Sequence, residues 1–203
     1  MIFRLLWILF SFILGSLPFS VWVGRLALRD DIRQYGDQNP GATNVLRAGG
    51  RVWFVLALML DIAKAAAPVG LAYYIFGWRG WEMWAIAMAP PAGHAFSPFL
   101  NWQGGKAVAA AFGAWIGVTI WEIPVLSILF LGFWFSLLTV SGWAVMGALA
   151  FILVYLLLFH PDPLLIAVAV GQFILLAYTH RADLRQRPHL RAFWRRLGGG
   201  SQV

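Results

Sequence analysis

The sequence WAVMGALAFILVYLLLF (residues 143–159) is followed, after His160 to Asp162, by PLLIAVAVGQFILLAYT (residues 163–179). Neither run contains a charged residue, and each approaches the roughly 20 apolar residues that an α-helix needs to cross a bilayer. Because the connection between them is so short, two consecutive helices must run antiparallel. This stretch therefore predicts a helical hairpin inside a membrane.

The composition of the whole chain indicates the same fold class. Of the 203 residues, 61% are hydrophobic and 11% are charged, and the mean hydropathy is +0.76. Because these values are far from those of soluble domains, we expect an all-α integral membrane protein. The length suits a single transmembrane domain, 1–203, with a short basic tail at about 181–203. The chain has no cysteine, which excludes disulfides, Cys-ligated metal and a cysteine acyl-enzyme.

Apolar segments recur along the chain and predict a bundle of about seven transmembrane helices. We expect these spans at about 3–27, 52–76, 81–99, 106–121, 124–138, 143–159 and 163–179. Twelve of the fifteen Lys and Arg residues fall in the connections of one side, whereas the other side has only Arg4 and Arg79 and Lys64 lies within a span. By the positive-inside rule, the C-terminus is expected in the cytoplasm and the N-terminus outside.

Polar stretches interrupt the apolar runs, and this topology places all of them on the cytoplasmic side. They are residues 36–51 (GDQNPGATNVLRAGGR), 93–109 (GHAFSPFLNWQGGKAVA), 141–143 (SGW) and 180–185 (HRADLR). We expect the four connections to converge on one face of the membrane. Positive charge alone would satisfy the topology, so the glycine, amide and histidine residues beside it indicate a binding site.

Two of these stretches have the pattern of a phosphate site, in which glycine-rich backbone lies beside a cation at a helix start. In QGGKAVAAAFG, two glycines precede Lys106, which we expect to open the fourth helix. In NPGATNVLR, amide and hydroxyl donors precede Arg47, whose planar guanidinium suits bidentate binding of phosphate. Two such cradles indicate two phosphorylated groups. The expected binding residues are Asn39, Gly41, Thr43, Asn44, Arg47, Gly104, Gly105 and Lys106.

Two further polar features lie within predicted spans. Asp61 and Lys64 are three residues apart and share a helix face, so they either neutralise each other or leave Lys64 to draw anions inward. Pro90 and Pro91 each lack a backbone donor, which predicts a helix break just before His94.

The order and spacing of several motifs resemble the PlsY family of bacterial acyl-phosphate:glycerol-3-phosphate acyltransferases. The motifs span nearly the whole chain: GSLP (15–18), GATNVLRAGG (41–50), LDIAKA (60–65), GHAFSPFLNWQGGKAVA (93–109) and HRADLR (180–185). The resemblance implies a seven-span enzyme of the bacterial inner membrane, with its active site facing the cytoplasm. Such an enzyme moves a fatty acyl group from acyl phosphate to the 1-hydroxyl of glycerol 3-phosphate, giving lysophosphatidic acid and phosphate for phospholipid synthesis.

The resemblance also implies roles for particular residues. An acyl phosphate is already activated, so the protein has to align the hydroxyl, hold the phosphates and stabilise the developing oxyanion. His94 and His180 are candidates to take or relay the hydroxyl proton, because an ordinary histidine has a pKa of about 6.5. The substrate's own phosphate is an alternative base. Ser141 matches a polar position of the family and is expected to donate a hydrogen bond. The resemblance implies no metal or cofactor, no nucleic acid and no obligate protein partner; the partners are the two substrates and membrane lipids.

The chain departs from the family's usual pattern at several positions in or next to these motifs, three of which bear on the site. Asp37 stands where the family usually has serine, Asp183 where it usually has asparagine, and Ala107 where it usually has glycine. Each acid is a candidate to accept a proton or to orient His180, or else to weaken anion binding by repulsion. The alternative functions are a divergent relative with another acceptor or no catalysis, and a small anion carrier or membrane scaffold. A carrier would usually show broken helices in two repeated halves, and a scaffold would not need GGK and GATN on one face.

Overall fold

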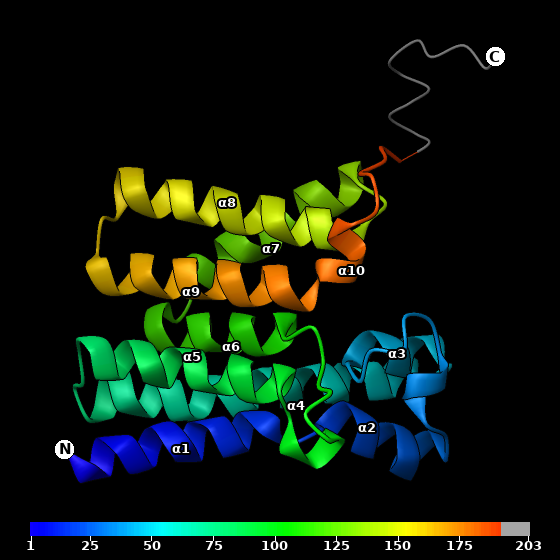
Figure 1. Ribbon diagram of the computed structural model, residues 1–203, viewed down its shortest axis with the longest axis horizontal. Coiled ribbons are helices and arrows are strands. Elements are labelled where there is room, and N and C mark those ends of the chain that lie inside the picture. Colours follow the sequence, from blue (N-terminus) through cyan, green and yellow to red (C-terminus); the bar gives the residue numbers. More distant parts are fainter. Residues whose placement is uncertain (192–203) are drawn as a thin grey trace. The chain divides into compact units, whose positions relative to one another are not determined.

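The computed structural model describes residues 1–191, so the part of the expected basic tail from residue 192 to 203 lies outside the described residues. Apart from an isolated bridge between Leu138 and Leu190, all regular secondary structure of the described residues is helical, which confirms the all-α prediction. Its contacts divide the chain into two compact units, Met1–Trp121 and Glu122–Val203 (Figure 1).

The first unit combines long helices with shorter helical segments and loops (Figure 1). Its α-helices are α1 (Ile2–Ser16), α2 (Phe19–Val23), α3 (Ala42–Arg47), α4 (Arg51–Gly70), α5 (Trp81–Ala95) and α6 (Val108–Thr119). π-helical turns continue α2 over Gly24–Leu28 and α4 over Leu71–Ile75, and 3-10 turns lie at Ile32–Gln34 and Pro98–Leu100. Within this unit, α1 packs on α5 and α4 packs on α6.

Small residues bring these helix pairs into close contact. A Cβ atom added at Gly113 of α6 would lie only 2.2 Å from the carbonyl oxygen of Ile62 in α4. A Cβ at Gly93 of α5 would lie 2.2 Å from the carbonyl oxygen of Phe12 in α1. Membrane helices are commonly held together by such close backbone approach, because lipid supplies no hydrophobic drive for their association.

The helix break expected before His94 is wrong, because α5 continues through Pro90 and Pro91 and ends at Ala95. A proline removes only its own N–H group, and neighbouring groups can compensate for that loss within a membrane bundle. Here α1 covers this part of α5 so closely that a Cβ at Gly15 would lie 2.4 Å from the Cα atom of Pro90.

The break occurs instead in the first span, where α1 ends at Ser16 and α2 begins at Phe19. Leu17 is extended, with φ −60° and ψ 124°, and Pro18 has no N–H group to continue the helix. The ammonium group of Lys64 in α4 donates a 2.8 Å hydrogen bond to the carbonyl oxygen of Leu17. A charged side chain therefore satisfies the backbone at the break.

Helices long and apolar enough to cross a membrane occur at Ile2–Leu28, Arg51–Ile75 and Ser141–Phe159. The apolar helices Val108–Thr119, Glu122–Leu137 and Pro163–Thr179 are shorter. The expected number of seven spans and their orientation therefore stay predictions.

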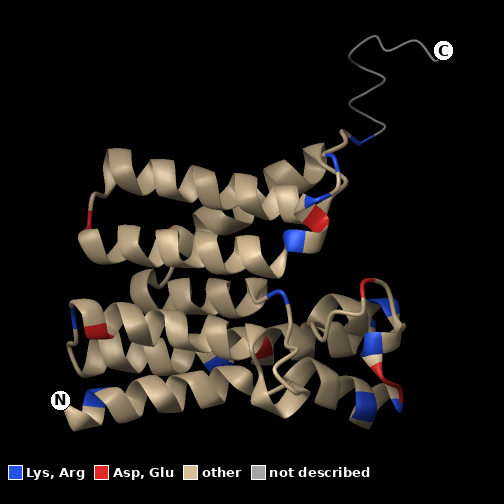
Figure 2. Cartoon of the chain, in the orientation of Figure 1, with Lys and Arg blue, Asp and Glu red and all other residues tan. Residues whose placement is uncertain are grey.

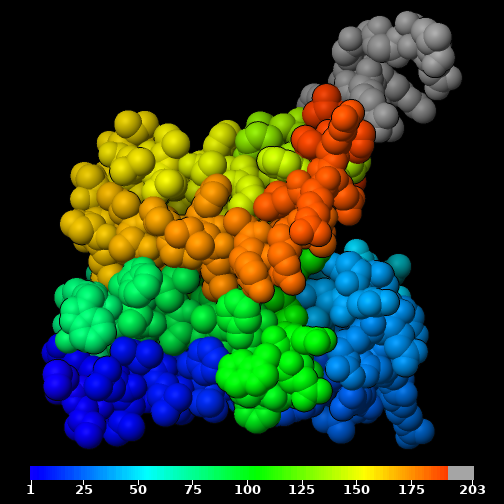
Figure 3. Space-filling view, in the orientation of Figure 1, coloured from blue at the N-terminus to red at the C-terminus, as the bar shows by residue number. Residues whose placement is uncertain are grey.

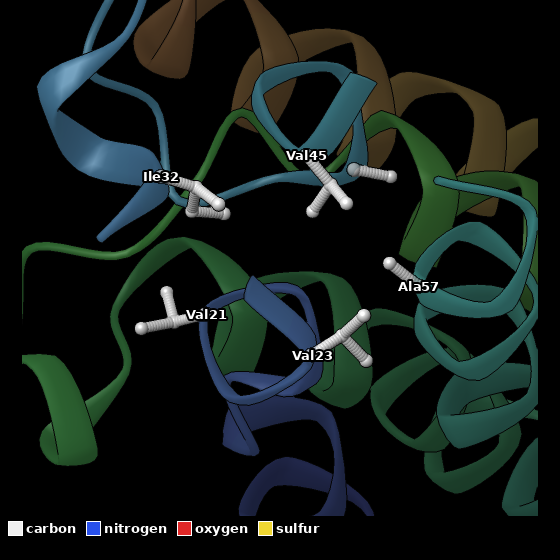
Figure 4. Close-up of a cluster of buried hydrophobic side chains, with 6 residues drawn as sticks. Val21, Val23, Ile32, Val45 and Ala57 are labelled. Carbon is white, nitrogen blue, oxygen red and sulfur yellow. The ribbon is translucent and has the colours of Figure 1, made fainter. Parts of the chain in front are cut away.

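A buried apolar cluster attaches the segment between α2 and α4 to these helices. Val21, Val23, Ile32, Val45 and Ala57 are each 8% exposed or less and belong to one cluster of buried side chains (Figure 4). Removing such side chains from water stabilises the fold by about 25 cal/mol per Å² of apolar surface. The space-filling view shows residues 24 to 50 as a compact mass at one end of the unit, beside the segment that leads into α6 (Figure 3).

The second unit contains α7 (Glu122–Leu137), α8 (Ser141–Phe159), α9 (Pro163–Thr179) and the short α10 (Arg181–Leu184). The predicted hairpin of α8 and α9 is confirmed by their mutual packing. Asp162 caps α9, because its Oδ1 atom accepts hydrogen bonds from the N–H groups of Leu164 and Leu165 at 2.7 and 3.0 Å. In each unit, charged residues lie mainly at helix ends and in connections (Figure 2).

Candidate active site

The connection before α3 and the connection into α6 meet through one carboxylate. Asp37 Oδ1 lies 2.9 Å from Arg47 Nη1, and Asp37 Oδ2 lies 2.8 Å from Lys106 Nζ. The two cations expected to bind phosphate are therefore neighbours, although they are far apart in the sequence. Both are paired with an acid that sequence analysis had considered as a proton acceptor or as a source of repulsion.

Amide side chains complete the link between these two connections. Arg47 Nη1 donates a 2.8 Å hydrogen bond to Asn44 Oδ1, and Asn44 Nδ2 donates a 2.8 Å bond to the carbonyl oxygen of Asn39. The backbone N–H of Lys106 donates a 2.9 Å bond to Asn39 Oδ1. We call the closed circuit of Asp37, Asn39, Asn44, Arg47 and Lys106 the Asp37 ring.

Gly36 is needed where it stands for two independent reasons. Its φ angle is +55°, in the left-handed region that favours glycine. A Cβ atom there would also lie 2.2 Å from Arg47 Nη1. The absence of a side chain at this position thus leaves room for the guanidinium group. Thr43, expected to donate to phosphate, is exposed in the first turn of α3 and lies outside the Asp37 ring.

The cations of the Asp37 ring change the acidity of the carboxyl group. Burial raises the pKa of Asp37, but the hydrogen bond and charge of Lys106 and the charge of Arg47 together lower it by more. The net result is a pKa below the usual range of an aspartate. Asp37 is therefore ionised at neutral pH, and the ring carries one net positive charge.

The glycine N–H groups expected to face a phosphate are engaged elsewhere. Gly104 donates to the carbonyl oxygen of Ala95 at 3.1 Å, and Gly105 donates to that of His94 at 3.0 Å. These carbonyl groups belong to the last turn of α5, where backbone carbonyls have no hydrogen-bond donors within the helix. Similarly, the N–H of Gly41 donates to the carbonyl oxygen of Asn39 at 2.8 Å. The two loop glycines thus hold the connection against α5.

Helix α6 begins at Val108, two residues later than the expected start at Lys106. Ala107 precedes it with a φ of 62°, in the left-handed region. An alanine pays a penalty of roughly 1–2 kcal/mol in that conformation, whereas glycine adopts it freely. The resemblance implies glycine at this position, and glycine would adopt this turn without the penalty that Ala107 pays.

A small cavity lies beside the Asp37 ring in the first unit. Its lining includes Ser16, Lys64, His94, Ser97 and Gly105. Sequence reasoning had not selected the two serines, which are buried and joined by a 2.6 Å hydrogen bond from Ser97 Oγ to the carbonyl oxygen of Ser16. Both serines lie within the motifs GSLP and GHAFSPFLNWQGGKAVA, and this was the available signal, but only the packing of α1 on α5 shows that they meet.

Asp61 and Lys64 form a buried ion pair behind this cavity. Lys64 Nζ lies 2.7 Å from Asp61 Oδ1, and Ser20 Oγ donates a 2.5 Å hydrogen bond to Asp61 Oδ2. Neutralisation of one residue by the other, which was one of the two expectations, is thus what the structure shows. His94 Nδ1 lies 3.9 Å from Asp61 Oδ1 and has no hydrogen-bond partner among the described residues. The imidazole is therefore buried with one nitrogen available.

The remaining expected residues lie together in the second unit. Ser141 Oγ donates a 2.7 Å hydrogen bond to Asp183 Oδ2, so this acid engages the serine that we expected to bind substrate. His180 is buried, and its Nδ1 atom lies 2.8 Å from the carbonyl oxygen of Leu176. Because a carbonyl can only accept, Nδ1 carries the proton and Nε2 is the basic nitrogen of the neutral ring.

The family model described as glycerol-3-phosphate acyltransferase matches residues 5–188. The chain belongs to this family. The glycerol-3-phosphate acyltransferase of Maridesulfovibrio salexigens is 36% identical over 183 residues, covering 89% of this chain and 91% of the relative. That of Photorhabdus laumondii is 37% identical over 158 residues, covering 76% and 70%.

Solved structures agree with the assignment to the glycerol-3-phosphate acyltransferase family. The chain is similar to PlsY, an integral membrane glycerol 3-phosphate acyltransferase, in its glycerol 3-phosphate form, with a TM-score of 0.82 and 28% identity. For the lysophosphatidic acid form the TM-score is 0.80 and the identity 27%. Both comparisons cover 96% of this chain and 98% of the other. The resemblance to the PlsY family is confirmed.

Proposed function

We propose that this protein transfers a fatty acyl group from an acyl phosphate to the 1-hydroxyl of glycerol 3-phosphate, which yields lysophosphatidic acid and inorganic phosphate. Membership of the glycerol-3-phosphate acyltransferase family supports an acyltransferase of phospholipid synthesis. The observation that carries the proposal is the position of Arg47 and Lys106, both within 2.9 Å of one carboxylate. Two cations that hold the oxygens of a carboxylate can also hold the oxygens of a phosphate.

The reaction needs an aligned hydroxyl, an acceptor for its proton and stabilisation of a leaving phosphate. The hydroxyl oxygen attacks the carbonyl carbon of the acyl phosphate, and the carbon–oxygen bond to the phosphate breaks. The phosphate leaves with the electron pair of that bond. Three bases are candidates for the hydroxyl proton: His180 through Nε2, His94 through its unpartnered nitrogen, and the phosphate of the substrate itself.

The remaining residues have binding and positioning roles in this proposal. Arg47 and Lys106 hold phosphate, Asn39 and Asn44 fix them, and Ser141 donates a hydrogen bond once Asp183 releases it. Lys64 lines the cavity with its charge balanced by Asp61, and we assign it a binding role through its ammonium hydrogen-bond donors.

We place the protein in the bacterial inner membrane, with the site facing the cytoplasm. The asymmetric distribution of Lys and Arg supports this orientation. Acyl phosphate and glycerol 3-phosphate are its expected partners.

The test uses purified full-length protein in detergent with a long-chain acyl phosphate. We expect phosphate release that depends on glycerol 3-phosphate and does not occur with glycerol. A hydrogen bond to a charged group contributes about 1.5–3 kcal/mol, so Arg47→Ala or Lys106→Ala should each lower kcat/KM about 10-fold or more. Arg33→Ala is the control, because Arg33 belongs to the same loop but pairs with Asp31.

Three results would contradict this proposal. Phosphate release without any acceptor would indicate hydrolysis, and transfer to another alcohol alone would indicate a divergent relative. If kcat/KM of Arg47→Ala and of Lys106→Ala equals that of the control Arg33→Ala, the proposed phosphate site is refuted.

A further inference from the structure

The Asp37 carboxylate occupies the position that a phosphate needs. Its two oxygens contact one cation each, Arg47 Nη1 at 2.9 Å and Lys106 Nζ at 2.8 Å. A tetrahedral phosphate bridging the same two nitrogen atoms would present two of its own oxygens in this way. The carboxylate and a bridging phosphate therefore cannot both be seated on the pair.

The Arg47 side chain and the Lys106 backbone have contacts that do not depend on Asp37. Arg47 Nη1 also donates a 2.8 Å hydrogen bond to Asn44 Oδ1. The backbone N–H of Lys106 donates a 2.9 Å hydrogen bond to Asn39 Oδ1. If the carboxylate leaves, these bonds keep the guanidinium group and the connection that carries Lys106 in place.

The Asp37 carboxylate also has room to move away from the two cations. The side chain of Asp37 is 38% exposed, and it stands between Gly36 and Gln38, whose φ angles are +55° and +59°. An exposed side chain in a tight turn can rotate into solvent, where water solvates the carboxylate, so the two ion pairs can open without unfolding the loop.

We propose that Asp37 is a specificity-determining residue that occupies the phosphate position of the Arg47–Lys106 pair and must be displaced by the substrate. This inference rests on the proposed function and adds a competition within the same site. With two cations and one carboxylate, the free site has one net positive charge instead of two. The site discriminates against weakly held anions, and only a ligand with further contacts displaces the carboxylate.

Isothermal titration of full-length protein in detergent tests the competition directly, with inorganic phosphate and glycerol 3-phosphate as probes. Removing the competing charge should tighten binding of both probes at least about 10-fold in Asp37→Asn and in Asp37→Ser. Using two variants guards against a folding defect in either one. Asp31→Asn is the matched control, because it removes an equal charge from the same loop where the partners are Arg33 and Arg25; its affinities should stay within about twofold of wild type.

A second comparison separates competition from a structural role. In wild type, Lys106 is already paired with Asp37. The loss of phosphate affinity caused by Lys106→Ala should therefore be smaller in wild type than in the Asp37→Asn background. The KM for glycerol 3-phosphate should fall in Asp37→Asn, whereas a merely structural aspartate would leave it unchanged or raise it.

The inference and the proposed function fail in different ways. If Arg47→Ala and Lys106→Ala weaken phosphate binding but Asp37→Asn and Asp37→Ser leave it unchanged or weaken it, the competition is refuted and the proposed site stands. If Arg47→Ala and Lys106→Ala have no effect on phosphate binding, the site itself is refuted, and the competition with it.

Discussion

Replacement of Gly104 by alanine should be among the most damaging small changes in this chain. A Cβ atom at this position would lie 2.0 Å from the carbonyl oxygen of His94 and 2.6 Å from that of Ala95. An ordinary carbon–oxygen contact is about 3.3 Å or longer, so the connection must move away from α5 by more than about 1 Å. Both obstacles are backbone atoms, which no side-chain rotation can move aside.

The cost follows from the contacts that such a movement breaks. Overpacking costs about 1–3 kcal/mol, and the hydrogen bonds donated by Gly104 and Gly105 to the end of α5 contribute about 0.5–1.5 kcal/mol each. We therefore expect Gly104→Ala to lower the free energy of unfolding by about 2–6 kcal/mol. Lys106 lies two residues after Gly104 in the same connection, and a displacement of about 1 Å at a catalytic site can reduce the rate about 100-fold.

Thermal unfolding in detergent and phosphate release from acyl phosphate measure the two effects. Gly132→Ala is the control, because a Cβ there meets nothing within 4 Å and the position is inside α7. Alanine at a helix interior gains up to about 1 kcal/mol over glycine, so this control should be as stable as wild type or more so. A Gly104→Ala protein with wild-type stability and activity would refute the close packing of this connection on α5.

Two further predictions concern charge. Because the folded pKa of Asp37 is lowered, its contribution to stability is complete above the unfolded pKa of about 3.9 and is lost as the pH falls through the lower folded value. The difference in unfolding midpoint between wild type and Asp37→Asn should thus be constant from about pH 5 to 8 and shrink below about pH 4; a difference that grows on acidification would contradict the ion pairs. For topology, single cysteines replacing Gln38 and Leu190 should label from the cytoplasm and one replacing Arg79 from outside. Labelling of the first two from opposite sides would refute the seven-span arrangement.

Much of the fold was predictable because most of its helices coincide with long apolar runs in the sequence. The hairpin of α8 and α9 follows from two uncharged segments and a connection too short for any other geometry. Helix ends were harder, since they depend on tertiary contacts. The break at Leu17 is stabilised by Lys64 from another helix, and the continuation of α5 through Pro90 is supported by the close approach of α1.

The candidate site was predictable in its residue types but not in its pairings. Arg47 and Lys106 stand out as cations beside glycines, and the spacing of Asp61 and Lys64 suggests their ion pair. Nothing local indicates that Asp37 would contact a lysine in a distant connection. The same is true of the loop glycines, whose N–H groups were expected to face a ligand but pair with the end of α5.

The bond from Lys64 to Leu17 has a consequence for how the protein is made. The acceptor belongs to the first helical segment, whereas the donor comes 47 positions later in the chain. During synthesis, α1 and α2 enter the membrane with an exposed carbonyl group at their joint, and lipid offers no donor to satisfy it. The joint is closed only when α4 arrives and brings its ammonium group against Leu17. Insertion of α4 therefore completes this joint, and a chain truncated before α4 would leave the carbonyl group of Leu17 without this donor.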